Sequence, residues 1–223
     1  MSRILQSYLT AFFVIVAIAL TFKMTIEQGM HKPLSDHNGF WSKFIAATIS
    51  WQDYDLAGYV MYEKVLDELQ GKIISNEVIE NARKLEDVGA EGLYPIVTMD
   101  LGFIDHCRAS FALFGYTIES LLYFYFLLFF ISVACFFLEF NNNSTAALFL
   151  IGFLIAHHIV ASVPTSNAQL ETVFNNRYLS VLAILPVVHI SMLVLSNKRI
   201  NVPALVFVII QSALIVFVIQ LRS

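Results

Sequence analysis

The chain has 223 residues, of which 58% are hydrophobic and 13% are charged, and its formal net charge is −4. Soluble globular proteins are about 45–50% apolar and about 25% charged, so this composition excludes an ordinary soluble domain and indicates an integral membrane protein. Residues 23–117 are acidic, since they hold eight Lys/Arg and fourteen Asp/Glu. Nucleic-acid binding requires clustered positive charge, so we expect no nucleic-acid partner.

The first apolar run covers residues 4–22 and follows Arg3. A cleavable signal peptide has an apolar stretch of only ~7–15 residues, although the small residues Ala17 and Ala19 offer a cleavage site. We therefore expect residues 1–22 to form a retained signal anchor and the first membrane helix.

The acidic segment 23–117 is expected to form a small helical cap outside the membrane. Helical spacing of apolar residues predicts one helix over 53–70, ended by Gly71. Ser75 is expected to cap a second helix that runs to about Val88. The inward-facing residues of that second helix are expected to be Val78, Ala82 and Leu85.

A third helix of the cap is predicted from Pro95 to Phe114, with Gly115 breaking it before the next apolar run. Three short helices bury little apolar surface. We therefore expect the cap to rest on the membrane helices or on another protein.

Four further apolar runs predict membrane helices, because each approaches the roughly 20 residues that cross a ~30 Å hydrocarbon core. These runs, which form a four-helix bundle over 118–223, are 118–138, 146–163, 179–195 and 202–221. Thr117 and Ser144 are expected to cap the first two helices, and Pro186 is expected to bend the third. The expected fold class is an all-α membrane protein with about five transmembrane helices and a helical extracytoplasmic cap between the first and second.

Lys and Arg in short loops indicate orientation, because they concentrate on the cytoplasmic side. A cytoplasmic N-terminus places Arg3 and the pair Lys198-Arg199 inside, against Arg177 and Arg222 outside. This count favours a multi-pass protein of the plasma (inner) membrane whose N-terminus is cytoplasmic.

Three histidines lie at membrane depth, where ionisable residues often mark function. His157 and His158 belong to the run 146–163, and His189 belongs to the run 179–195. Imidazoles from two helices can bind a metal or haem iron, or they can form hydrogen bonds between helices. Neither run contains a carboxylate to orient a ligating histidine. We therefore predict no metal site, with His189 donating to a backbone or hydroxyl group, and no pattern identifies a cofactor.

A second polar group precedes and enters the run 118–138. It comprises Asp100, Asp105, His106, Arg108 and Glu119. A histidine beside carboxylates is a candidate general acid or base near neutral pH. The alternative, which we favour, is a solvated and salt-bridged helix just above the membrane.

Two other segments carry short polar motifs. The first reads Asp53-Tyr54-Asp55-Leu56-Ala57-Gly58-Tyr59, and the second reads Arg177-Tyr178-Leu179 before the run that contains Pro186. Together they resemble parts of polytopic membrane glycosyltransferases that use lipid-linked sugars. Such enzymes carry an acidic catalytic or metal-binding residue in the first long extracytoplasmic loop, and they have more spans than the five expected here.

The resemblance implies a catalytic role for Asp53 or Asp55, as base or metal ligand. It also implies that Arg177 and Tyr178 bind substrate, since a guanidinium suits an anionic phosphate. The chain lacks a complete catalytic set at the level of sequence. We therefore favour a binding or assembly subunit of a membrane complex, with the lipid bilayer and another membrane protein as partners. The alternative is a glycosyltransferase-like enzyme at the outer membrane surface.

Overall fold

The computed structural model describes residues 3–29, 34–35, 40–50, 60–85, 93–95, 102–140, 143–162, 181–196 and 201–221. Within these residues the fold is helical, with nine helices and two short antiparallel strand pairs. The chain divides into two compact units. We call Met1–Gly29 with Tyr125–Val218 the bundle unit, and Met30–Phe124 with Ile219–Ser223 the inserted unit.

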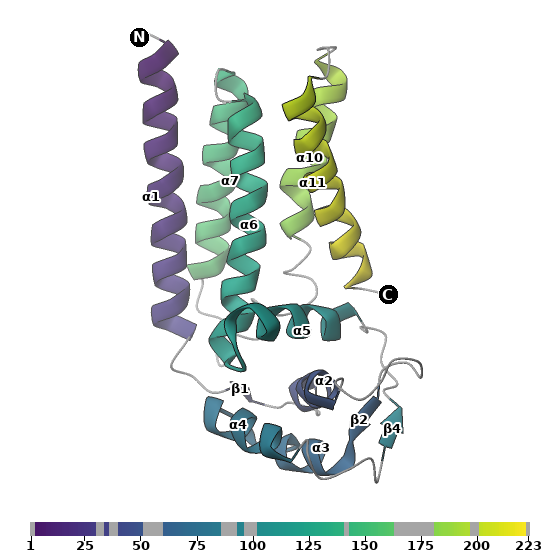
Figure 1. The fold of residues 1–223 in the computed structure, drawn as a ribbon. Coiled ribbons are helices and arrows are strands. Elements are labelled where there is room, and N and C mark those ends of the chain that lie inside the picture. Colours follow the sequence, from purple (N-terminus) through teal and green to yellow (C-terminus); the bar gives the residue numbers. More distant parts are fainter. Residues whose placement is uncertain are drawn as a thin grey trace. The chain divides into compact units, whose positions relative to one another are not determined.

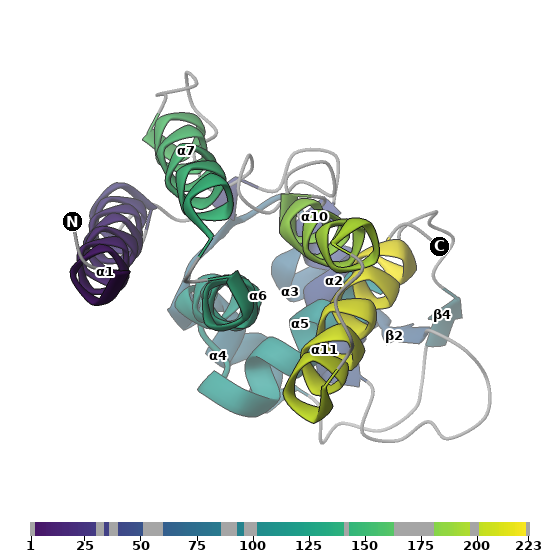
Figure 2. The same ribbon diagram turned by 90° about the horizontal axis from the view of Figure 1, so that it is seen from above.

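Five long helices build the bundle unit, although the first turns of α6 and the last turn of α11 belong to the inserted unit. They are α1 (Arg3–Gly29), α6 (Ile118–Phe140), α7 (Ser144–Ser162), α10 (Val181–Leu195) and α11 (Val202–Gln220). Their axes lie alongside one another, and successive helices reverse direction (Figures 1 and 2). Each expected apolar run therefore lies on a helix.

Asparagine side chains start two of these helices. The Oδ1 atom of Asn143 accepts from the backbone N–H groups of Thr145 and Ala146 at 3.0 and 3.1 Å. Asn201 Oδ1 likewise accepts from the N–H of Ala204 at 2.9 Å. The prediction that Ser144 caps α7 is therefore wrong by one residue, because the side-chain carbonyl of Asn143 accepts from the unpaired N–H groups of the first turn.

Two of the five helices are long and apolar enough to cross a membrane, judged by length and composition over the described residues. They are α6 and α11. The other three contain shorter apolar stretches, which are Tyr8–Lys23, Ser144–Ile159 and Val181–Leu195. The stretch Val181–Leu195 is ~22 Å long at 1.5 Å per residue. Pro186 lies inside this helix and is buried.

The bundle unit exposes large apolar side chains on all five helices. Examples, one from each helix, are Phe12, Phe130, Leu148, Val194 and Ile209. Polar side chains of the same helices are buried instead. These are Thr10, Thr21, Ser132, His157, His189 and Gln211.

The inserted unit is built around a helix that the sequence reading did not anticipate. Its elements are β1 (Leu34–Ser35), α2 (Phe40–Ile49), β2 (Val60–Tyr62), α3 (Glu63–Leu69), β3 (Ile73–Ile74), α4 (Asn76–Lys84), β4 (Leu93–Pro95) and α5 (Gly102–Phe114). Helix α2 packs against α3, α4, α5 and β2. Its described side chains are buried all round apart from the half-buried Lys43, as expected of a central core helix.

Short antiparallel strands occupy some positions for which we had expected helix. Strand β1 pairs with β3 and β2 pairs with β4, with Met61 opposite Tyr94. Within the predicted helix over 53–70, residues 60–62 form β2 and residues 63–69 form α3. Within the helix predicted from Pro95 to Phe114, Pro95 ends β4 and residues 102–114 form α5. Pairing with a distant strand overrides the local helical pattern here, as tertiary context often does.

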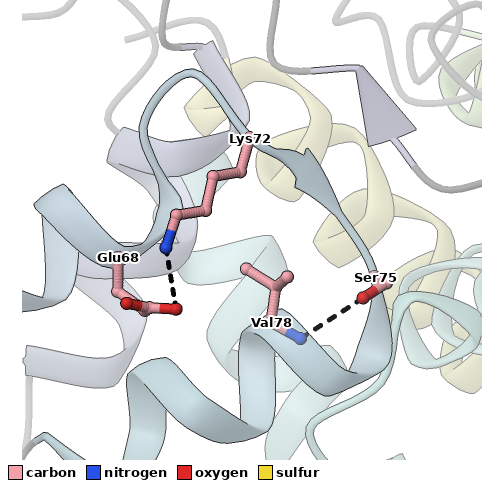
Figure 3. Close-up of polar contacts among 4 residues, drawn as sticks. All are labelled: Glu68, Lys72, Ser75 and Val78. Atoms are coloured by element: carbon pink, nitrogen blue, oxygen red, sulfur yellow. Dashed lines mark hydrogen bonds and ion pairs between the residues drawn. The ribbon is translucent and has the colours of Figure 1, made fainter.

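The connection between α3 and α4 follows the sequence reading closely. Gly71 has φ +72°, a left-handed conformation that ends α3. Lys72 forms an ion pair with Glu68 at 2.8 Å, and Ser75 Oγ accepts from the Val78 N–H at 3.3 Å (Figure 3). The expected cap at Ser75 is thus confirmed. The inward face of α4 is carried by Ile79 and Ala82, so the expected inward position of Val78 is wrong by one residue.

Candidate functional site

The residues implied by the glycosyltransferase resemblance lie outside the described residues. These are Asp53, Asp55, Arg177 and Tyr178. Asp100 of the second polar group also lies outside them. The catalytic and substrate-binding roles of the four residues therefore stay predictions, and the candidate site is built from the polar groups inside the bundle unit.

His157 pairs with a tyrosine of the neighbouring helix. Its Nε2 atom lies 2.9 Å from the Tyr125 hydroxyl, and both side chains are buried. The imidazole also stacks on Phe129, with ring centroids 4.3 Å apart. This contact joins α7 to α6 through one hydrogen bond and one aromatic stack.

His158 points to a different helix. Its Nδ1 atom lies 3.0 Å from Thr21 Oγ1, and that hydroxyl donates its only hydrogen to the Ala17 carbonyl at 2.8 Å. The hydroxyl oxygen must therefore accept, so Nδ1 of His158 carries the proton. The hydrogen bond joins α7 to α1, the helix pair in closest contact in the bundle unit.

His189 takes part in a network that we call the Ser132–Gln211–His189 clamp. Ser132 Oγ donates to Gln211 Oε1 at 3.0 Å, and Gln211 Nε2 donates to the Ser132 carbonyl at 3.0 Å. The second hydrogen of the same amide faces Nδ1 of His189 at 3.2 Å. Because an amide nitrogen only donates, Nδ1 accepts and the neutral imidazole carries its proton on Nε2. The clamp links α6, α10 and α11.

Aromatic rings surround the His189 imidazole. Phe140, Phe136 and Phe207 lie at centroid distances of 5.2, 5.7 and 6.5 Å, all edge-to-face. Nε2 has no hydrogen-bond partner among the described residues. An N–H group that faces aromatic π-systems gains only a weak interaction. This donor is thus the least well-paired polar group of the clamp.

The three histidines consequently hold three different helix contacts. Hydrogen bonding between helices, which we favoured, is what the geometry provides. His189 accepts from an amide, however, and it donates to no hydroxyl or backbone group within the part of the chain that the structure describes. Among the described residues no group of three or more His, Cys, Asp or Glu side chains could hold a metal ion. The arrangement can fix the rotation of helices, because these hydrogen bonds form only when the helices pack at one register.

Within the second polar group, His106 lies in a packed core and not on a solvated face, whereas Asp105 is half-buried and Arg108 is exposed. His106 is fully buried, stacked on Phe103 at 5.5 Å and tilted against Phe124 at 5.2 Å. Burial lowers the pKa of His106 to about 3, and a backbone hydrogen bond with Leu121 only partly offsets this. Such a histidine is neutral at pH 7 and is poorly matched to proton transfer there. Burial likewise raises the pKa of the Cys107 thiol.

Glu119, a further member of that group, takes part in a contact that sequence reasoning missed. Asn76 Nδ2 donates to Glu119 Oε2 at 2.9 Å, and Asn76 Oδ1 accepts from the Ile118 N–H at 2.9 Å. Asn76 thus caps α6 from 42 residues away, while Thr117 Oγ1 pairs with Ser120 Oγ. The expected capping role of Thr117 is therefore taken by Asn76, a residue that no local pattern marks.

Gln211 of the clamp could be noticed in the sequence, because an amide inside an apolar run of membrane length is unusual. Ser132 of the clamp and Tyr125, the partner of His157, could not be noticed in this way, since hydroxyl groups are common in such runs. Comparison with known proteins finds no matching family model, no matching curated protein and no matching solved structure.

Proposed function

We propose that the protein is an integral membrane subunit whose bundle unit crosses the bilayer five times and carries the inserted unit as a binding or assembly domain. The observation that carries the proposal is the burial pattern of the bundle unit. Its helices turn apolar side chains outward and keep hydrogen-bonded polar side chains inside.

This pattern suits hydrocarbon better than water. The core helix of a soluble protein is mostly buried, yet only 22% of the apolar stretch of α11 is buried, against 56% for α6. Leaving a large apolar side chain in water forgoes about 1.5–3 kcal/mol, and a domain has a net stability of only about 5–15 kcal/mol. Several such side chains on each of five helices therefore favour a lipid environment.

The alternating helix directions support five crossings. In the bundle unit α1, α7 and α11 run one way, and α6 and α10 run the other (Figure 1). The inserted unit follows α1 and precedes α6 in the chain. We infer that it lies on the side of the membrane opposite the α6–α7 turn, outside the cytoplasm if the N-terminus is cytoplasmic.

Labelling with a membrane-impermeant maleimide tests this topology. Gln70→Cys in the inserted unit and Thr145→Cys at the α6–α7 turn both replace exposed residues, in a background lacking Cys107 and Cys135. In intact cells we expect Gln70→Cys to react and Thr145→Cys to react only after permeabilisation. Equal reaction of both before permeabilisation would refute the five-crossing topology.

An assembly role is supported by what the described polar residues do. Those of the bundle unit bond to one another across helices, and His106 is locked in a core. These side chains hold helices in place. The inserted unit has its own buried centre in α2, so its exposed helices α3 and α4 are available for a protein partner.

Site-specific photo-crosslinking in native membranes tests the assembly role. Crosslinkers are placed at the exposed positions Asp67 and Glu80 of the inserted unit, with exposed Leu205 of α11 as the lipid-facing control. We expect a discrete larger protein product from Asp67 or Glu80 and none from Leu205. The uncrosslinked 25.2 kDa chain alone, from both test positions, would argue against an assembly subunit.

A further inference from the structure

Side chains typical of a membrane–water interface lie together where α5 ends and α6 begins. Leu113 and Phe114 end α5 and are 61% and 40% exposed. Tyr116 and Tyr123 are half-buried beside them. We call these four residues, together with Arg83, the α5–α6 corner. All five belong to the inserted unit.

Ring contacts hold the corner together. The Phe114 and Tyr123 rings are 5.8 Å apart, and the Phe111 and Tyr116 rings are 5.1 Å apart. The Arg83 guanidinium lies 4.4 Å above the centroid of Tyr116, at the distance of a cation–π interaction. The apolar residues Leu113 and Phe114 nevertheless stay exposed, so this packing leaves an apolar edge facing outward.

This apolar edge lies next to the start of the apolar helix α6. Gly115 has φ +89° and ends α5 after Phe114, and α6 begins three residues later. Tyr123 lies ~7.5 Å along α6 from Ile118, at 1.5 Å per residue. Since Phe114 touches Tyr123, it shares the level at which α6 becomes continuously apolar.

We propose that the α5–α6 corner is an interfacial anchor, in which Leu113 and Phe114 insert at the boundary between lipid headgroups and acyl chains. This inference rests on the proposed membrane location of α6. The chemistry fits, because Tyr and Arg are amphipathic and prefer the headgroup level, while apolar side chains of an interfacial helix enter the bilayer by ~5–10 Å.

Nitroxide depth measurement tests the anchor in the full chain, reconstituted into phosphatidylcholine–phosphatidylglycerol vesicles. Single cysteines replace Leu113, Phe130 and Ile73 in a Cys107→Ala, Cys135→Ala background, and each is spin-labelled. Phe130 is an exposed mid-helix position of α6, and Ile73, 62% exposed, is a matched apolar position on β3. Relaxation by oxygen reports the bilayer interior, and relaxation by a water-soluble nickel chelate reports the aqueous phase.

We expect Ile73→Cys to be reached by nickel, Phe130→Cys by oxygen, and Leu113→Cys to lie between them, within ~10 Å of the phosphate level. Nickel accessibility of Leu113→Cys equal to that of Ile73→Cys, with Phe130→Cys deep, would overturn the anchor and leave the membrane location intact. Shielding of Leu113→Cys from both reagents would also overturn it, since protein and not lipid would then cover the corner. Nickel access at Phe130→Cys would refute the membrane location together with the anchor.

Discussion

At the scale of single residues, several buried polar side chains of the bundle unit have a partner on another helix. These are Thr21, Ser132, His157, His189 and Gln211. The Gln211 amide makes three such hydrogen bonds, two with Ser132 and one with His189. In a low-dielectric interior an unpaired polar group is costly. The clamp therefore selects one rotation of α10 and α11 against α6.

Replacing Gln211 with Leu should destabilise the bundle unit, because the partner groups of the amide stay buried without it. We expect a loss of about 1–3 kcal/mol in the free energy of unfolding, measured by thermal unfolding in mild detergent. Ser212→Ala, at the adjacent half-buried position, is the control and should change stability little. In a double-mutant cycle with Ser132→Ala, the coupling energy should be about 0.6–1.7 kcal/mol; strictly additive losses would contradict the clamp.

His106 makes the stability of the inserted unit depend on pH. Its pKa is about 3 in the folded chain and about 6.5 in an unfolded one. Above pH 6.5 both states are neutral and the contribution is complete. Below pH 6.5 only the unfolded state gains the proton, so stability falls progressively towards pH 3, by up to a few kcal/mol.

Comparison of wild type with His106→Phe isolates this effect from the other histidines. We expect the melting temperature of the wild-type inserted unit, followed by tryptophan fluorescence, to fall more steeply between pH 7 and pH 4.5 than that of the variant. Trp41 is buried in this unit and reports its unfolding. Parallel pH profiles for the two proteins would show that His106 is not protonated on unfolding.

At the scale of elements, the residues that cap the starts of helices come from very different distances along the sequence. Ser75 and Asn143 cap their helices from within three residues. Asn76 caps α6 from a distant helix and bonds to Glu119 as well. This long-range cap ties α4 to the first turn of α6, so movement of one end changes the other.

Asn76→Ala should loosen the first turn of α6, because it removes the acceptor of the Ile118 N–H. A lost helix cap costs about 0.5–2 kcal/mol, and hydrogen exchange of residues 118–121 should accelerate accordingly. Asn81→Ala is the matched control, since Asn81 is exposed on the same helix and alanine favours helix there. Equal exchange at the start of α6 in both variants would disprove the cap.

At the scale of the whole molecule, two units with different surfaces share one chain. Both units bury apolar side chains together with a few polar ones, but the bundle unit also exposes large apolar side chains on all five of its helices. Because each unit has its own buried side chains, we expect damage to one core to stay within that unit.

Ile45→Ala tests this separation, because Ile45 is fully buried on α2. Loss of a buried isoleucine costs about 2–5 kcal/mol, so hydrogen exchange should accelerate over α2 and α5. Ile73→Ala removes the same atoms at an exposed position and should change stability by less than about 0.5 kcal/mol. Exchange in α7 and α10 should stay unchanged in both variants; acceleration there with Ile45→Ala would indicate a single cooperative unit.

Much of the helical framework could be predicted from the sequence, because it depends on local patterns. Uninterrupted apolar runs locate the five long helices, since backbone groups in such runs are best satisfied within a helix. Gly71, Ser75 and Gly115 mark element ends through conformational preferences that need no distant partner. Helix α2 escaped notice because a short helix that is apolar all round lacks the polar–apolar alternation on which the prediction depends.

The candidate site was predictable only as a set of residue types within long apolar runs. Imidazole and amide groups in apolar runs must find partners, and that much follows from the sequence. Which partner each group takes was decided by the tertiary structure. His157 and His158 turn to different helices because adjacent residues differ by about 100° around the helix. His189 meets Gln211, and Asn76 meets Ile118, only because helices distant in sequence pack together at one register.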